Sequence, residues 1–338
     1  MTPRPRTTHP DPRLRVTVVS AVPMMYRDGP DPSVDRPGWV RAASGLAWWH
    51  GALAVVQDDT HIVAHVDPNT GLAEALLLPA SEGVRQFGTD RGNKAAKADL
   101  ECCLVLPDGG LVGFGSGSTL ARRRVVRIDD PESPPRLFEA PGLYAALKAH
   151  PGFSGSELNL EGVCPLGDRL WLFQRGNGAP RDGRSPCNAT ATLALDAFVD
   201  YLRRAEVDPT ASLGADLRDV THWDLGRIDG VPWTFTDAAP GPPAGSPLPR
   251  DGVAWIAAAE ASPNTYDDGA NLGVALGYLT AAGEAGYARI VGADGAPETR
   301  KGEGLAFCPG APDLAWMVVD LDDPSRPAEL LTLRLSEA

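Results

Sequence analysis

Five acidic or hydroxyl residues recur along the chain, each just before a short apolar run. They are spaced 57 to 76 residues apart and comprise Ser44, Glu101, Glu161, Asp237 and Glu303. Carboxylates brought together in a poorly solvated site repel one another unless a cation lies between them. Ligands that offer only oxygen suit a hard ion, and five protein oxygens with added water favour Ca²⁺ over Mg²⁺. We therefore predict a central metal site formed by these five residues.

A second interpretation of the same residues needs no metal. Each acidic side chain could instead accept hydrogen bonds from neighbouring backbone N–H groups and so staple adjacent elements together. The repetition itself supports one shared structural position, and it does not decide between the two interpretations.

Charged residues near these anchors suggest a substrate site. Lys97, Arg175 and Lys301 could neutralise an anion, so we predict that they bind a small anionic substrate. Asp58 and Asp59 end another apolar run and are predicted to line the same site, where they would orient a water or a second ion. The three basic residues have no evident packing task, so we expect Arg175→Ala to leave stability almost unchanged.

No residue is assigned a catalytic role. The chain lacks Gly-x-Ser-x-Gly, the phosphate-binding Gly-x-x-x-x-Gly-Lys-Ser/Thr motif and a helix-opening Gly-x-Gly-x-x-Gly. Its six histidines do not cluster as ligands.

The composition favours an all-β protein and excludes several partners. The 37 Gly and 32 Pro of the 338 residues are spread between short apolar runs, which is typical of many short strands joined by turns. A net charge of −13 disfavours nucleic acid, because binding to a phosphate backbone needs a basic face. No apolar run resembles a signal peptide or is long enough to cross a bilayer, so we expect a cytoplasmic protein without a membrane partner.

The anchors recur because the chain is a repeat. Each anchor opens a unit of about four short strands, and the first unit comprises Gly45–Trp49, Ala52–Gln57, Ile62–Asp67 and Leu72–Leu78. Four-stranded antiparallel units repeated radially form a β-propeller. Equivalent positions on its inner strands then form a ring about the central axis. The sequence therefore predicts a five-bladed β-propeller.

The last unit ends one strand short, after Ala328–Leu335. The alternating run Leu14–Ser20 would complete that blade and remove its open edge. We therefore expect residues 1–13 to be a disordered arm and residues 14–338 to form one domain closed by the N-terminal strand. A six-bladed propeller is the alternative, if Val207–Ile228 contains a degenerate blade. A two-sheet sandwich would not explain five equivalent anchors.

Several hairpins resemble those of phytase-like and esterase-like propellers. Asp99-Leu100-Glu101 followed by Pro107-Asp108-Gly109 is similar to their Asp-x-Glu-Gly…Pro-Asp-Gly pattern, and Asn159–Val163 and Lys301–Phe307 look like the same element. The order Ser, Glu, Glu, Asp, Glu is similar to the central calcium ring of five-bladed apyrase-type nucleotidases. Thr60-His61-Ile62 departs from the Arg-Thr-Gly of that type. The resemblance thus implies the metal ring and leaves the substrate chemistry open.

Two hypotheses for function follow. In the first, the protein is a calcium- or magnesium-dependent hydrolase of a small anionic substrate, a phosphate ester or anhydride. The ion would polarise a substrate oxygen or lower the pKa of a bound water. In the alternative, the protein is a non-catalytic scaffold that binds a ligand or another protein, and its metal only locks the blades, because a fold does not determine a function. The oligomeric state is not predicted.

Overall fold

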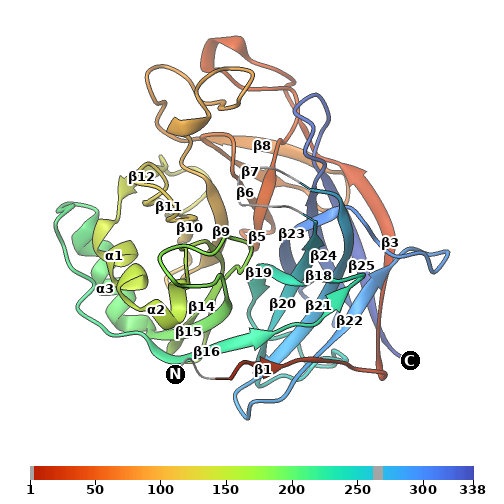
Figure 1. Ribbon diagram of the computed structural model, residues 1–338. Coiled ribbons are helices and arrows are strands. Elements are labelled where there is room, and N and C mark those ends of the chain that lie inside the picture. The colour runs from red at the N-terminus through yellow and green to blue at the C-terminus, as the bar shows by residue number, and fades with distance from the viewer. Residues whose placement is uncertain (1–3, 262–268) are drawn as a thin grey trace.

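The computed structural model describes residues 4–261 and 269–338, which fold into antiparallel sheets arranged around an axis (Figure 1). The first sheet contains β5 (Ala43–Trp49), β6 (Ala52–Gln57), β7 (Ile62–Val66) and β8 (Leu72–Leu77), with β4 (Met25–Tyr26) at its edge. The second contains β9 (Leu100–Val105), β10 (Leu111–Gly115), β11 (Arg124–Ile128) and β12 (Arg136–Glu139). In both, consecutive strands pair, as the repeat predicts.

The remaining strands continue the same pattern. The third sheet contains β13 (Leu160–Leu166), β14 (Arg169–Gln174), β15 (Asn188–Ala194) and β16 (Arg218–Asp224). A nine-stranded sheet joins β19 (Thr234–Ala239), β20 (Gly252–Glu260), β21 (Asn271–Thr280) and β22 (Ala285–Val291) to β3 (Leu14–Pro23), β25 (Glu329–Glu337), β24 (Leu314–Asp320) and β23 (Lys301–Phe307). Its ninth strand, β2 (His9–Pro10), pairs with β22. Its two halves meet where β22 and β3 pair in parallel.

The innermost strands close a cycle around the axis. β5 contacts β9, β9 contacts β13, β13 contacts β19, β19 contacts β23, and β23 returns to β5. Glycine permits this close approach: a Cβ on Gly162 would lie 2.9 Å from the backbone nitrogen of Ala238, and one on Gly304 would lie 3.0 Å from the carbonyl carbon of Gly45. The architecture is therefore all-β and propeller-like.

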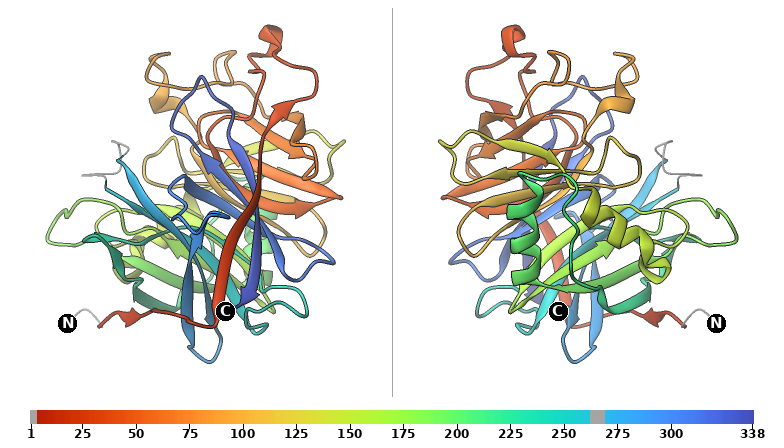
Figure 2. Two further views of the ribbon diagram at one scale, coloured as in Figure 1. Left: turned by 90° about the vertical axis from the view of Figure 1, so that its right-hand side faces the viewer. Right: turned by 90° about the vertical axis from the view of Figure 1, so that its left-hand side faces the viewer.

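Apolar side chains fill the wedges between neighbouring sheets. Trp48 on β5 stacks on Trp316 on β24, with ring centroids 5.3 Å apart. Helices cover the outer side of the second and third sheets, where α1 (Pro141–Ala149) and α3 (Leu195–Ala205) contribute to one apolar cluster with β9, β10, β13 and β15 (Figure 2). The short α2 (Pro151–Ser154) follows α1. No helix among the described residues is long and apolar enough to span a membrane.

The N-terminal segment is built into the sheets. β3 pairs antiparallel with β25 from Leu14 to Pro23, as the sequence predicts for the missing last strand. The prediction of a disordered arm is wrong for the strands β1 (Arg6–Thr7) and β2 (His9–Pro10), because each pairs with an open strand edge, of β16 and β22 respectively. Residues 1–3 of that predicted arm lie outside the described residues.

The segment on which the six-bladed alternative depends contributes only two strands. Val207–Ile228 contains β16, the fourth strand of the third sheet, and β17 (Arg227–Ile228), which pairs with β18 (Val231–Pro232). The short η1 (Pro32–Val34) and η2 (Lys94–Ala96) lie in the long loops before β5 and β9. These loops extend together from one end of the molecule (Figure 2).

Deletion of residues 1–22 is expected to destabilise the whole fold. It removes Leu14, Val16 and Val18, which are all at most 9 % exposed, and each buried side chain of this kind contributes about 1.5–3 kcal/mol. Their combined loss is comparable to the total stability of many domains, about 5–15 kcal/mol. Thermal unfolding should show a large fall in Tm or an insoluble product. Deletion of residues 1–5, which ends before β1, is the control. A soluble 1–22 deletion with an unchanged Tm would contradict the closing role of β3.

Candidate metal centre

Each inner strand carries a β-bulge near its start, and the bulges position the ring of predicted ligands. The pairing register shifts by one residue between each inner strand and its neighbour. The extra residue of each bulge is Ser44, Glu101, Glu161, Thr236 or Glu303 in turn. A bulge redirects the side chain of its extra residue. Four of the five predicted anchors therefore occupy equivalent positions.

At the fourth anchor, the structure shifts the predicted alignment of the repeated units by one residue. Thr236, rather than Asp237, is the bulge residue of β19, and its Oγ1 donates a hydrogen bond to the carbonyl oxygen of Gly302 (2.6 Å). Because one step along a strand reverses the side-chain direction, Asp237 points to the adjacent inner strand. Its Oδ2 accepts a hydrogen bond from the backbone N–H of Leu305 (2.8 Å). This contact is of the kind that the staple interpretation describes. A metal-binding role for Asp237 stays a prediction.

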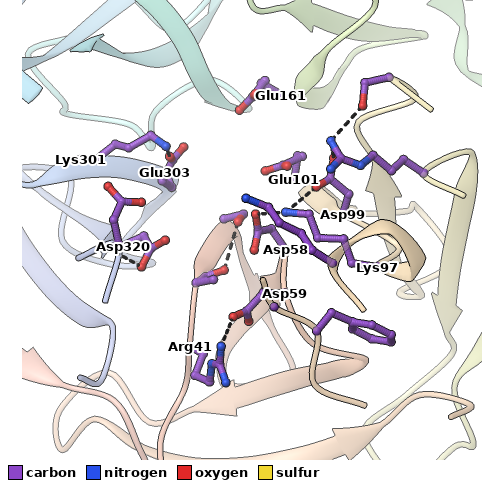
Figure 3. A pocket seen from close by; sticks show the side chains of 18 of the residues that line it. Arg41, Asp58, Asp59, Lys97, Asp99, Glu101, Glu161, Lys301, Glu303 and Asp320 are labelled. Carbon is purple, nitrogen blue, oxygen red and sulfur yellow. Dashed lines mark hydrogen bonds and ion pairs between the residues drawn. The ribbon is translucent and has the colours of Figure 1, made fainter. Parts of the chain in front are cut away.

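The remaining predicted site residues line one cavity of about 400 Å³ (Figure 3). They come from every inner strand except β19 and from the loops at the same end, and they are Ser44, Asp58, Asp59, Lys97, Glu101, Glu161, Arg175, Lys301 and Glu303. Among all lining residues, twelve carry carboxylates and six carry cationic side chains. The cavity therefore has a formal excess of negative charge.

On one side of the cavity, Lys97 lies between two aspartates. Its Nζ is 2.6 Å from Asp58 Oδ2 and 2.7 Å from Asp99 Oδ1. Asp99 Oδ2 also contacts Arg122 Nη1 (3.0 Å) and accepts a hydrogen bond from the Ser116 hydroxyl (2.5 Å). Together with Glu101, the two aspartates offer ligand atoms that all lie within 4.8 Å of one another and could hold a metal ion.

On the other side, Arg175 and Lys301 neutralise the ring glutamates only partly. Arg175 Nη1 is 3.3 Å from Glu161 Oε1, and its Nη2 is 2.7 Å from Glu260 Oε2. Lys301 Nζ is 2.7 Å from Glu303 Oε1. The second oxygens of Glu161 and Glu303 are buried and have no hydrogen-bond partner among the described residues. One oxygen of each of these two ring glutamates thus remains open within the cavity, and Asp59 Oδ1 is likewise buried without a partner among the described residues.

Burial raises the pKa of several of these carboxyl groups. Removal from water raises the pKa of Glu161 to about 7, with further repulsion from Glu303 opposing the attraction of Arg175. It also raises the pKa of Asp59 to about 6, with repulsion from Asp58. Burial, with repulsion from Asp99 and Glu161, holds the pKa of Glu101 well above its usual range. The protein thus holds carboxylates here at an electrostatic cost.

Three lining residues matter to the site and were not predicted as part of it. Asp99 shares the triad with Glu101, Glu260 bridges Arg175 and Lys301, and Arg41 pairs with Asp59 at 2.6 Å. Asp99 belongs to the motif Asp99-Leu100-Glu101, so the sequence pattern could have indicated that it lies in the site. Its backbone adopts the left-handed conformation (φ 58°), which aspartate tolerates better than most residues. Glu260 and Arg41 meet their partners only through the tertiary fold.

The fold and the site define an all-β, propeller-like protein with an acidic axial cavity. Residues 39–335 match the model of a family described as a family of unknown function (DUF6929), and the chain belongs to that family. No curated protein has significant sequence similarity to it.

Solved structures with similar folds share little sequence with the chain. A GH93 α-L-arabinofuranosidase of Fusarium graminearum has 11 % identity and a TM-score of 0.47, with 94 % of this chain and 98 % of that chain covered. A glutaminyl cyclase of Myxococcus xanthus has 12 % identity and a TM-score of 0.44, with 97 % and 100 % covered. The Pan2 WD40 domain of Neurospora crassa has 8 % identity and a TM-score of 0.39, with 97 % of each covered. The function is therefore inferred from the site itself.

Replacement of Arg175 by methionine is expected to destabilise the protein strongly. The premise of a nearly neutral Arg175→Ala change, that Arg175 has no packing task, is wrong, because Arg175 is only 4 % exposed and contacts two buried carboxylates. Removal of one partner from a buried ion pair costs about 3–5 kcal/mol. Urea unfolding in EDTA should show this loss. Arg334→Met, at an exposed position beside Asp313, should change the unfolding free energy by less than about 0.5 kcal/mol. Equal stabilities of the two variants would contradict this account.

The metal-free protein should lose stability as the pH rises from about 5 to 7.5. Glu161 and Asp59 have folded-state pKa values of about 7 and 6, above their unfolded values of 4.5 and 3.8. In this window the folded state binds more protons than the unfolded state, so stability falls with rising pH. Tm measured in EDTA should therefore decline across the window, and Glu161→Gln should reduce the decline. A Tm that rises steadily from pH 5 to 7.5 would refute the raised pKa values.

Proposed function

We propose that the cavity binds a divalent cation, Ca²⁺ or Mg²⁺, and that the protein is a metal-dependent hydrolase of a small anionic substrate, a phosphate ester or anhydride. The observation that carries this proposal is the pair of open oxygens, Glu161 Oε2 and Glu303 Oε2. Both residues are at most 5 % exposed, both occupy equivalent bulges, and both face a cavity with excess negative charge. A buried, unpaired carboxylate oxygen is costly, and a cation would remove that cost.

The donor set supports a hard cation. Glu101, Glu161 and Glu303 converge on the same space from three inner strands (Figure 3), and Ser44 occupies the equivalent bulge on β5. All four offer oxygen, which calcium and magnesium prefer. We further propose that the sheets form five blades closed by β3, similar to the apyrase-type propellers whose calcium ring the sequence resembles. Asp237 does not line the cavity, and its Oδ2 is held by Leu305 while its Oδ1 is buried without a partner among the described residues.

Because carboxylates outnumber cationic side chains in the cavity, an anionic substrate would need a bound metal ion in order to bind there. Lys97, Arg175 and Lys301 already pair with carboxylates, so they offer positive potential rather than free cationic groups. A bound divalent ion would supply an electrophile for a substrate oxygen or a water of lowered pKa. Asp58 and Asp59 lie at the edge of the same space and would orient a water or the substrate. Binding of the anion should therefore require the metal.

Removal of divalent ions should lower both stability and activity. A ligand that binds only the folded state stabilises it by mass action, so EDTA should lower Tm and added calcium should restore it. Phosphate release from phosphate esters and anhydrides should be absent in EDTA and return with Ca²⁺ or Mg²⁺. Glu303→Gln, which removes one anionic ligand and keeps its shape, should weaken calcium binding at least about tenfold, or about 1.4 kcal/mol.

The matched control is Glu74→Gln, the same substitution at an exposed position on β8, which should change neither calcium binding nor activity. If calcium raises Tm but no ester or anhydride is hydrolysed, the alternative function, a metal-locked scaffold, is supported. If neither calcium nor magnesium binds, both functions fail, and the carboxylates act only as staples.

A further inference from the structure

The Lys97 ammonium lies where the triad of carboxylates would hold an ion. Its Nζ contacts Asp58 Oδ2 and Asp99 Oδ1 at 2.6 and 2.7 Å, and these aspartates with Glu101 form the group whose oxygens lie close enough to bind a metal. The Lys97 side chain is only 8 % exposed. The buried ammonium of Lys97 therefore lies between two carboxylates of the group that could otherwise bind a metal ion.

The ring glutamates on the opposite side differ from this arrangement. Glu161 and Glu303 each use one oxygen for an internal cation, Arg175 or Lys301. The other oxygen of each is buried without a partner among the described residues. Asp58 and Asp99 therefore share a cation that the chain itself supplies, whereas Glu161 and Glu303 each present an open buried acceptor.

We infer that Lys97 serves as a built-in cation at Asp58 and Asp99, so that a divalent ion binds on the Glu161–Glu303 side and a second ion is kept out. This inference rests on the proposed metal binding, which it deepens by assigning the number of ions and their position. It also gives Lys97 a task other than contact with an anionic substrate.

The second position would persist without Lys97, because other contacts hold the Asp99 carboxylate and the backbone of Asp58. The Ser116 hydroxyl and Arg122 fix Asp99. The backbone N–H of Asp58 donates to the carbonyl oxygen of Ala42 (3.0 Å), which anchors that residue. A neutral side chain at position 97 would therefore leave a preformed group of oxygen ligands with no internal cation between Asp58 and Asp99.

Lys97→Met, which keeps the reach of the side chain and removes its charge, should open this position to a second ion. Calcium titration by calorimetry, with metal content measured after dialysis, should give one ion per chain for the wild type and two for Lys97→Met. Lys94→Met is the matched control: Lys94 lines the same cavity and forms no ion pair among the described residues, so its variant should bind one ion. The double variant Lys97→Met/Asp58→Asn should return to one.

The outcomes separate this inference from the proposed function. If the wild type binds one ion and Lys97→Met binds one with affinity within threefold, Lys97 does not exclude an ion and the inference is overturned. If the wild type binds none and Lys97→Met binds one, the role of Lys97 is supported and the site at Glu161 and Glu303 is refuted. If neither protein binds calcium or magnesium, both proposals fail.

A further variant tests the inference even if Lys97→Met does not fold. In the wild-type background, Asp58→Asn should leave calcium affinity within threefold, because the ion lies on the Glu161–Glu303 side, whereas Glu303→Gln should weaken it at least tenfold. A loss of more than tenfold in Asp58→Asn would locate the ion beside Asp58 and overturn the inference.

Discussion

Compensation of buried negative charge is the constraint on which the rest of this structure depends. Closure of the inner strands brings carboxylates from several sheets into one cavity, where burial removes them from bulk water. The chain meets this cost partly with its own cations, since Lys97, Arg175 and Lys301 each contact two carboxylates. Burial raises the pKa values of Glu101 and Glu161, and the incomplete compensation leaves repulsion between carboxylates that raises them further. That deficit is the physical basis of the proposed cation binding.

Two backbone features bring the carboxylates to this position. The bulge near the start of β5, β9, β13 and β23 turns one side chain toward the cavity. Glycine directly after the bulge, as at Gly162 and Gly304, lets the next inner strand approach closely. In β19 the corresponding residue is Asp237, and its carboxylate binds the neighbouring strand instead. The same local geometry therefore places a carboxylate in the cavity in some strands and a contact between neighbouring strands in another.

Asp35 links the loop before β5 to the loop that carries Lys97. Its carboxylate accepts hydrogen bonds from the backbone N–H groups of Arg85 and Gln86 and from the Arg91 guanidinium. These contacts fix the beginning of the segment that brings Phe87 and Lys97 to the cavity. The loop that carries the internal cation is thus positioned by contacts between residues 50 to 56 apart in sequence.

The sequence by itself determined the strands, the repeated units and most of the ring. Short apolar runs between turns specify strands locally, and equivalent strands place Glu101, Glu161 and Glu303 at equivalent positions. The sequence also predicted the pairing of the N-terminal strand with the last strand, because the final repeated unit is one strand short. Only the tertiary structure decided the register of β19, since a one-residue bulge leaves no mark in the pattern and exchanges Asp237 for Thr236. It also decided that Arg175 is buried and that Lys97 lies between Asp58 and Asp99. Ion pairs of this kind depend on which loops meet in space, and the spacing of charges along a chain does not record that.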